Sequence, residues 1–136
     1  MDAVITVTID RAKDEPAYEQ IARQIRACIA ANALRRGALL PGVRALAADL
    51  GVNLNTVARA YRLLADEGFV RIRDRSGVEV AAPAPTPAPD ASATFQAELD
   101  GLLARMRQAG LPAEVVRRMV DHQLDRLWTR RQESEN

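Results

Sequence analysis

Apolar residues recur at a spacing of three and four along most of this chain, a pattern typical of amphipathic helices. The first such stretch, residues 16–33, opens on Pro16, whose missing N–H is harmless in the first turn of a helix. Residues 3–9 precede it, and their many β-branched side chains predict a strand or an extended arm. Residues 34–41 predict a turn and a short extended piece, with Gly37 at the bend. The apolar stripe of the first helix comprises Tyr18, Ile21, Ala22, Ile25, Cys28 and Ile29.

Residues 44–68 predict two short helices that meet at a tight turn. Gly51 can adopt the positive φ that ends a helix, and Asn53 is a favourable N-cap for the second one. A rotation of about 100° per residue places the apolar and polar side chains of the second helix on opposite faces. The apolar residues are Ala45, Leu46 and Leu50 in the first helix and Val57, Tyr61 and Leu64 in the second.

The polar face of the second helix presents Asn55, Arg59 and Arg62. An asparagine side chain can pair bidentately with adenine, and an arginine side chain can pair with guanine or contact a phosphate. This combination is what a DNA-recognition helix needs. An ordinary surface helix with a polar outer side shows the same pattern, so the flanking elements have to separate the two interpretations.

Residues 69–80 predict a β-hairpin, because apolar and basic residues alternate on both sides of a turn at 74–77. Three helices followed by a hairpin with a basic tip is the order of a winged helix-turn-helix. In that arrangement the second helix of the motif enters the major groove, and the hairpin lies along the DNA backbone or the minor groove. A solvated amphipathic edge is the alternative for the hairpin. One hairpin face is expected to hold Val70, Ile72, Val78 and Val80, and the other face and the tip Arg71, Arg73 and Arg75.

The C-terminal part of the chain predicts a linker followed by two helices. Residues 81–94 hold four of the seven prolines and no bulky apolar residue, which is typical of a semi-extended linker. Gly110 ends one amphipathic helix, and Pro112 starts another, so that the pair forms a helical hairpin. Such a hairpin alone has too little core to be stable, and a second copy of the chain is its expected partner. The expected dimer interface consists of Phe95, Leu99, Leu102, Met106, Val116, Met119, Val120, Leu124, Leu127 and Trp128.

The expected fold class is therefore mostly α: an α+β winged helix-turn-helix domain followed by an α-helical hairpin for dimerisation. The winged helix-turn-helix DNA-binding domain is expected over residues 1–82. A Pro/Ala-rich linker would cover residues 83–93, and the two-helix dimerisation segment residues 94–132.

The distribution of charge indicates which part of the chain would meet a polyanion. The formal charge of the whole chain, +1, says little about partners. Residues 23–75, however, contain ten arginines against four acidic residues, a local charge of +6. From Pro83 onward seven arginines face eight acidic residues, a local charge of −1. The middle of the chain is thus the expected nucleic-acid surface.

The sequence shows no constellation for catalysis, a cofactor or a metal, so the chain is not expected to be an enzyme. Cys28 lies on an apolar stripe as a small apolar residue, and His122, the only histidine, is expected to be solvated or interfacial. No serine stands in a nucleophile elbow, and the glycines lack phosphate-loop spacing. With no membrane-length apolar run and no signal-peptide pattern, a cytoplasmic protein without membrane association is expected.

Three motifs stand together in this chain: Gly37-x-x-Leu40-Pro41, Arg44-x-Leu46-Ala47, and Gly51-Val52-Asn53-x-Asn55-Thr56-Val57-Ala58-Arg59-Ala60-Tyr61. With them, residues 16–80 resemble the DNA-binding domain of the GntR family of bacterial transcription regulators, most of all its short YtrA-type branch. The chain departs from the family at Gly42, where Ser is usual, and at Arg36, where Pro is usual. At the hairpin tip Asp74-Arg75-Ser76-Gly77 replaces a Gly-rich basic turn, and Glu79 stands where an aromatic residue is common.

The resemblance implies a sequence-specific transcriptional regulator, expected to be a repressor, that binds a pseudo-palindromic double-stranded DNA operator as a homodimer. It implies that Arg44 contacts a base or a phosphate and that the N-terminal half of the recognition helix meets the DNA. Helical rotation adds Arg62 as a phosphate contact. Asp74 would repel phosphates. The expected DNA-binding residues are Arg44, Asn53, Asn55, Thr56, Arg59, Arg62, Arg73, Arg75, Ser76 and Gly77.

The alternative from another functional class is a winged-helix module that binds a protein instead of specific DNA. A steep loss of duplex binding with salt would favour DNA, because it reports phosphate contacts. No cofactor is expected, and the sequence identifies no small-molecule effector.

Overall fold

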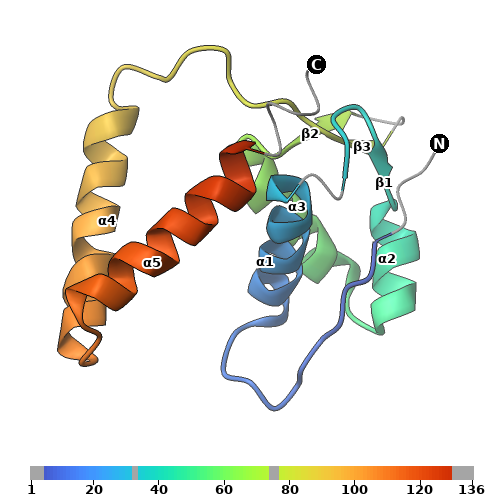
Figure 1. The fold of residues 1–136 in the computed structure, drawn as a ribbon. Coiled ribbons are helices and arrows are strands. Elements are labelled where there is room, and N and C mark those ends of the chain that lie inside the picture. Colours follow the sequence, from blue (N-terminus) through green and yellow to red (C-terminus); the bar gives the residue numbers. More distant parts are fainter. Residues whose placement is uncertain (1–4, 32–33, 74–76, 130–136) are drawn as a thin grey trace. The chain divides into compact units, whose positions relative to one another are not determined.

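The computed structural model describes residues 5–31, 34–73 and 77–129 of the chain. The chain divides into two compact units, Met1–Pro83 and Ala84–Asn136. The first unit contains three helices and a small sheet, and the second contains helices alone (Figure 1).

The first unit is a winged helix-turn-helix. Its three strands form an antiparallel sheet in the order β1-β3-β2, so the short strand before the helix-turn-helix pairs with the second strand of the hairpin. In the hairpin Val70 lies opposite Val80 and Ile72 opposite Val78. The elements are α1 (Ala17–Ala30), β1 (Leu39–Leu40), α2 (Val43–Leu50), α3 (Leu54–Asp66), β2 (Val70–Arg73) and β3 (Gly77–Val80).

The turn between α2 and α3 has the local chemistry that its sequence predicts. Gly51 has φ +68°, and its N–H donates to the carbonyl of Ala48 while the N–H of Val52 donates to that of Ala47. This pair of bonds is a Schellman ending, which satisfies carbonyls that the end of α2 leaves free. Asn53 caps α3, because its side-chain oxygen accepts a 2.8 Å hydrogen bond from the N–H of Asn55.

The N-terminal stretch 5–10 is an extended arm that lies along α1 instead of joining the sheet. Gln24 holds it by both ends of its amide: Oε1 accepts from the N–H of Thr8 at 3.0 Å, and Nε2 donates to the carbonyl of Thr8 at 2.7 Å. Gln20, which lies one helical turn before Gln24 and is 3% exposed, binds Asp10 in the same way. Its Oε1 accepts from the N–H of Asp10, and its Nε2 donates to the carbonyl of Asp10. The two glutamines thus substitute for the strand pairing that β-branched residues usually obtain in a sheet.

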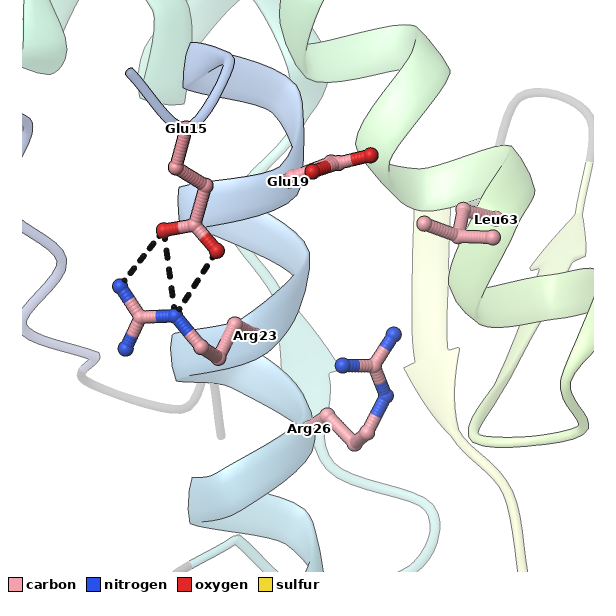
Figure 2. A pocket seen from close by; sticks show the side chains of 5 residues that line it. All are labelled: Glu15, Glu19, Arg23, Arg26 and Leu63. Atoms are coloured by element: carbon pink, nitrogen blue, oxygen red, sulfur yellow. Dashed lines mark hydrogen bonds and ion pairs between the residues drawn. The ribbon is translucent and has the colours of Figure 1, made fainter. Parts of the chain in front are cut away.

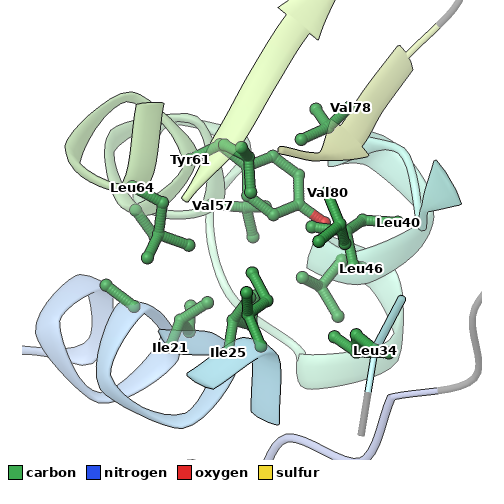
Figure 3. Packing of buried hydrophobic residues seen from close by; sticks show 14 of the residues in the cluster. Ile21, Ile25, Leu34, Leu40, Leu46, Val57, Tyr61, Leu64, Val78 and Val80 are labelled. Atoms are coloured by element: carbon green, nitrogen blue, oxygen red, sulfur yellow. The ribbon is translucent and has the colours of Figure 1, made fainter. Parts of the chain in front are cut away.

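The core of this unit is built around α3, which packs against α1, α2 and β2 (Figure 3). Tyr61 lies at its centre with 1% of its surface exposed, and its hydroxyl donates a 2.6 Å hydrogen bond to the carbonyl of Pro41. Burial raises the pKa of the Tyr61 hydroxyl, so it remains a neutral donor. The largest fully buried side chains are Tyr61, Ile21, Ile25, Leu64 and Val57.

Two expected core positions are exposed. Ile72 lies on the hairpin face that carries Val70 and Val78, but it is 47% exposed on the edge strand β2, while Val78 opposite it on the central strand is buried. Ala45 is exposed as well, and Ala47 takes the buried position beside Leu46. In both cases the element was predicted correctly, and its packing against distant segments decided which residue is covered.

The second unit consists of two helices joined by a tight turn. They are α4 (Ala91–Gln108) and α5 (Ala113–Leu124), and α5 continues into a π-helical turn, η1 (Asp125–Thr129). Gly110 has φ +91°, as the end of α4 requires, and Pro112 precedes α5 as predicted. The helix α4 already starts at Ala91, within residues 83–93 that were expected to be linker, because alanines follow the last proline of that stretch.

The two helices of the second unit diverge from their connecting turn (Figure 1). Most of their large apolar side chains are exposed. Neither helix has a buried residue. The largest exposures are those of Phe95, 64%, and Trp128, 60%. The other large exposed apolar residues of this unit are Leu99, Leu102, Leu103, Leu111, Met119, Val120 and Leu124.

Replacing Tyr61 with Phe tests how strongly the core depends on its one buried hydroxyl. The Tyr61→Phe variant leaves the carbonyl of Pro41 without its donor, and we expect it to lose about 1–3 kcal/mol of unfolding free energy. Chemical denaturation followed by circular dichroism measures this loss. Tyr18→Phe is the matched control, because the hydroxyl of Tyr18 bonds only to the exposed carboxylate of Glu19. Equal losses in the two variants would contradict the assignment.

Candidate nucleic-acid interface

The outer face of α3 carries the polar residues that its periodicity predicts. Asn55, Arg59 and Arg62 are exposed, and Thr56 beside them is half-buried. The opposite face of the helix is buried in the core and consists of Val57, Ala60, Tyr61 and Leu64. The helix is therefore held on one side and presents an amide and two guanidinium groups on the other.

At the N-terminal turn of α3, Asn53 accepts hydrogen bonds from two backbone N–H groups. The cap occupies the side-chain oxygen of Asn53, and the backbone oxygen of the same residue accepts from the N–H of Thr56 at 3.0 Å. The side-chain oxygen and the backbone oxygen of Asn53 thus both accept hydrogen bonds already. The side-chain NH₂ group is the part of Asn53 that can donate to a ligand. A helix N-terminus carries a partial positive charge, which favours a phosphate at this end of α3.

Arg44 extends the basic surface from α3 to the start of α2. It is the second residue of α2, it is exposed, and Gly42 caps the helix in an extended conformation without a side-chain bond. Gly42 thus fills the position where the family has Ser, but it supplies only backbone groups.

The arginines of the first unit fall into two groups according to their partners. Some form ion pairs with carboxylates: Arg23 with Glu15 at 2.9 Å and Arg26 with Glu67 at 2.6 Å. Within residues 5–31, 34–73 and 77–129, by contrast, no hydrogen bond or ion pair occupies the guanidinium groups of five others. These are Arg35, Arg36, Arg44, Arg59 and Arg62. The three arginines that the sequence predicts on α3 and at the start of α2 are therefore among those whose charge no carboxylate offsets in the described residues.

Arg59 nevertheless has a neighbour, because its Cζ atom lies 3.8 Å from the ring centre of Tyr18 on α1. This is a close cation–π contact. Helical periodicity had assigned Tyr18 to the apolar stripe of α1 alone, and the ring does border the core. Only the packing of α1 against α3 brings the two side chains together.

The hairpin, which we call the wing, is less basic than its sequence suggests. Arg73 forms a 2.9 Å ion pair with Glu79, and Arg71 approaches the same carboxylate at 3.8 Å. Gly77 begins β3 with φ +97°, a conformation that favours glycine. The tip residues Arg75 and Ser76 lie outside the described residues.

A shallow depression between α1 and α3 is lined by both signs of charge (Figure 2). The carboxylate of Glu15 accepts hydrogen bonds from Arg23, and this contact lowers the pKa of the carboxyl. Arg26 is bound to Glu67 and lies 5.8 Å from the ring centre of Phe69. Since these cations already have acidic partners, the depression is not suited to anions. In the part of the chain that is described, no three His, Cys, Asp or Glu residues are grouped to hold a metal ion.

One further residue at this surface was not predicted. Leu54, the first residue of α3, is 44% exposed beside Asn55. Helical rotation places it near the direction of Tyr61, on the apolar side. It stays exposed because the core covers α3 only from Val57 onward. No sequence signal would have identified it, because periodicity alone places Leu54 on the buried side.

The family model described as "Bacterial regulatory proteins, gntR family" matches residues 17–80. The chain is 41% identical over 85 residues to the HTH-type transcriptional regulator Rv1152 of Mycobacterium tuberculosis, a match that covers 62% of this chain and 70% of that protein. It is 30% identical over 109 residues to the HTH-type transcriptional repressor YtrA of Bacillus subtilis, covering 79% of this chain and 84% of YtrA.

Some relatives are much longer than this chain. The "Probable rhizopine catabolism regulatory protein MocR" of Rhizobium meliloti is 35% identical over 109 residues, which are 79% of this chain but only 22% of that protein. The shared part of such relatives is therefore a fraction of their length.

Two solved structures share the arrangement of the elements. YtrA from Sulfolobus acidocaldarius, a GntR-family transcription factor, is 34% identical and superimposes with a TM-score of 0.61, covering 75% of this chain and 97% of that one. AraR(DBD), in a complex with operator ORX1, is 21% identical with a TM-score of 0.51, covering 57% of this chain and 96% of that one. The second likeness concerns the fold alone. In the described part of the chain, no helix has the length and apolar character to cross a membrane.

The ion pair on the wing leads to a test of whether Arg73 meets DNA. In Glu79→Gln the carboxylate that holds Arg73 becomes neutral. We expect tighter binding to duplex DNA at low salt. We also expect a steeper plot of log affinity against log salt concentration, with the slope increased by about the amount that one additional phosphate contact contributes. Glu98→Gln on α4 changes the net charge equally and serves as the control. An unchanged slope in Glu79→Gln would show that Arg73 does not reach a phosphate.

Proposed function

Because the chain belongs to the GntR family of bacterial regulatory proteins, we propose that it is a homodimeric repressor that binds a pseudo-palindromic DNA operator. It is a winged-helix transcriptional regulator with a DNA-binding domain. The observation that carries the finer proposal is the outer face of α3. There Asn55, Arg59 and Arg62 stand exposed, without carboxylate partners within the described residues, on a helix whose other face is fully packed.

In this proposal α3 enters the major groove and reads bases through its N-terminal half. The amide of Asn55 pairs with adenine, and Arg59 pairs with guanine or a phosphate. The methyl groups of the exposed Leu54 suit contact with a thymine methyl group. Asn53 and Thr56 complete the end of the helix that meets the groove.

Contacts to the phosphates position the domain without reading sequence. Arg44 at the start of α2 and Arg62 one turn beyond Arg59 serve this role, since both are exposed and basic. Arg73 and Gly77 bring the wing to the backbone, with the ion pair to Glu79 limiting the contact. Arg75 and Ser76, outside the described residues, remain expected wing contacts.

The second unit serves as the dimer interface in this proposal. This unit exposes many large apolar side chains, and a folded chain rarely leaves so much apolar surface in water. A second copy of the same surface covers it with matching chemistry. Two domains related by a two-fold axis then meet half-sites about one helical turn apart.

The repressor role rests on similarity to a named repressor, YtrA of Bacillus subtilis. AraR(DBD), whose fold this chain shares, was solved in complex with an operator. The competing function is a winged-helix module for a protein partner. The uncompensated arginines favour DNA, because each phosphate contact releases counterions from the duplex.

Removing Arg59 tests the recognition helix. We expect Arg59→Ala to weaken binding to a duplex selected from a random pool by at least tenfold, the loss of about one good base or phosphate contact. The dimer should stay intact, since Arg59 lies in the first unit. A gel-shift titration at physiological salt measures the affinity, and Arg118→Ala on α5 is the control with the same loss of charge. An unchanged affinity of the Arg59→Ala variant would show that Arg59 does not contact the DNA.

A charge on the apolar side of α5 tests the dimer. Leu124→Glu should give a folded monomer, because a carboxylate in an apolar interface is costly to desolvate. Sedimentation velocity gives the mass, and Arg118→Glu, on the opposite side of the helix by rotation, should remain dimeric. A dimer that survives in Leu124→Glu places the interface elsewhere.

A further inference from the structure

The contact between Tyr18 and Arg59 joins the first turn of α1 to the outer face of α3. The Cζ atom of Arg59 lies 3.8 Å from the ring centre, well within the roughly 6 Å over which a cation–π attraction acts. At this separation the guanidinium plane lies against the ring face. The contact therefore uses the flat face of the cation and leaves its N–H groups, which point outward in the plane, free to donate.

The chemistry of this neighbour matters, because the ring holds the cation without cancelling its charge. Arg26 and Arg73 are held by the carboxylates of Glu67 and Glu79, which offset their charge and occupy their donors. Tyr18 offers Arg59 only the quadrupole of a neutral ring. Arg59 is thus ordered by the protein yet remains a full cation with open hydrogen-bonding capacity.

Tyr18 itself is firmly placed. Its ring borders the core, and its hydroxyl donates a 3.0 Å hydrogen bond to Glu19. Just before α1 the chain is locked by the buried Gln20, which donates to the carbonyls of Asp10 and Glu15 and accepts from the N–H of Asp10. The ring under Arg59 is therefore packed against the core, at the start of a helix that hydrogen bonds tie to the preceding segment.

We propose that Tyr18 is a positioning residue for DNA recognition, which stacks on Arg59 and orders its guanidinium before the duplex arrives. A long arginine side chain loses rotamer freedom on binding, and a side chain that is already ordered loses less. Tyr18 then contributes to affinity through Arg59, although Tyr18 is not on α3. The inference rests on the proposed function, namely that α3 binds DNA.

A double-mutant cycle on the full chain tests this role. The probe is the tightest duplex that the wild-type protein selects from a random pool, and affinities are measured at low salt, where phosphate contacts keep weakened variants measurable. Tyr18→Phe keeps the ring and should bind within about twofold of wild type. Tyr18→Leu keeps an apolar side chain without a π face and should bind about three- to tenfold more weakly. In an Arg59→Ala background, Tyr18→Leu should have no further effect.

A spectroscopic measurement separates positioning from a loss of folding. In the DNA-free protein the ring current of Tyr18 should shift the side-chain NMR signals of Arg59. We expect this shift to persist in Tyr18→Phe and to vanish in Tyr18→Leu, while the backbone signals of α3 stay in place. Loss of the α3 signals in Tyr18→Leu would instead make Tyr18 a structural residue and overturn the inference.

Two other outcomes also overturn it. Equal affinities for wild type and Tyr18→Leu would show that the stack does not assist binding. A weakening by Tyr18→Leu that persists in the Arg59→Ala background would show that Tyr18 acts independently of Arg59. The proposed function fails separately, if the wild-type protein retains no duplex even at low salt.

Discussion

The fold of the first unit depends on the burial of one side of α3. Val57, Tyr61 and Leu64 fill the space between α1, α2 and the sheet, and the hydroxyl of Tyr61 fastens the helix to Pro41, next to the start of α2. A helix anchored from Val57 to Leu64 in this way has a fixed orientation. Its outer residues therefore stand at fixed positions, as recognition of an ordered duplex requires.

Electrostatic pairing then decides which parts of the surface remain available to a polyanion. The chain is rich in arginine throughout residues 23–75, but the carboxylates of Glu15, Glu67 and Glu79 hold the arginines that lie at the periphery. The arginines on α3 and at the start of α2 have no such partner among the described residues. The predicted DNA-binding residues of α2 and α3 thus keep their positive charge, although the net charge of the chain is only +1.

The second unit differs from the first because its apolar side chains are not buried. Its helices have correct ends at Gly110 and Pro112, yet no side chain in α4 or α5 is buried. Helices of this length obtain most of their stability from packing of an apolar face rather than from propensity. The exposed faces around Phe95 and Leu124 are therefore the strongest structural argument for association with a second copy.

The sequence by itself determined the elements, their order, the family and the two faces of α3. These features depend on local rules: periodicity, the positive φ of Gly51, the cap at Asn53 and the alternation in the hairpin. The tertiary structure alone decided the exposure of Ile72, the ion pair of Arg73 with Glu79 and the stack of Arg59 on Tyr18. Periodicity reports which side of its own element a residue occupies. The partner that the residue meets on that side depends on strand register and on the packing of helices far apart in sequence. No local sequence pattern specifies these long-range contacts.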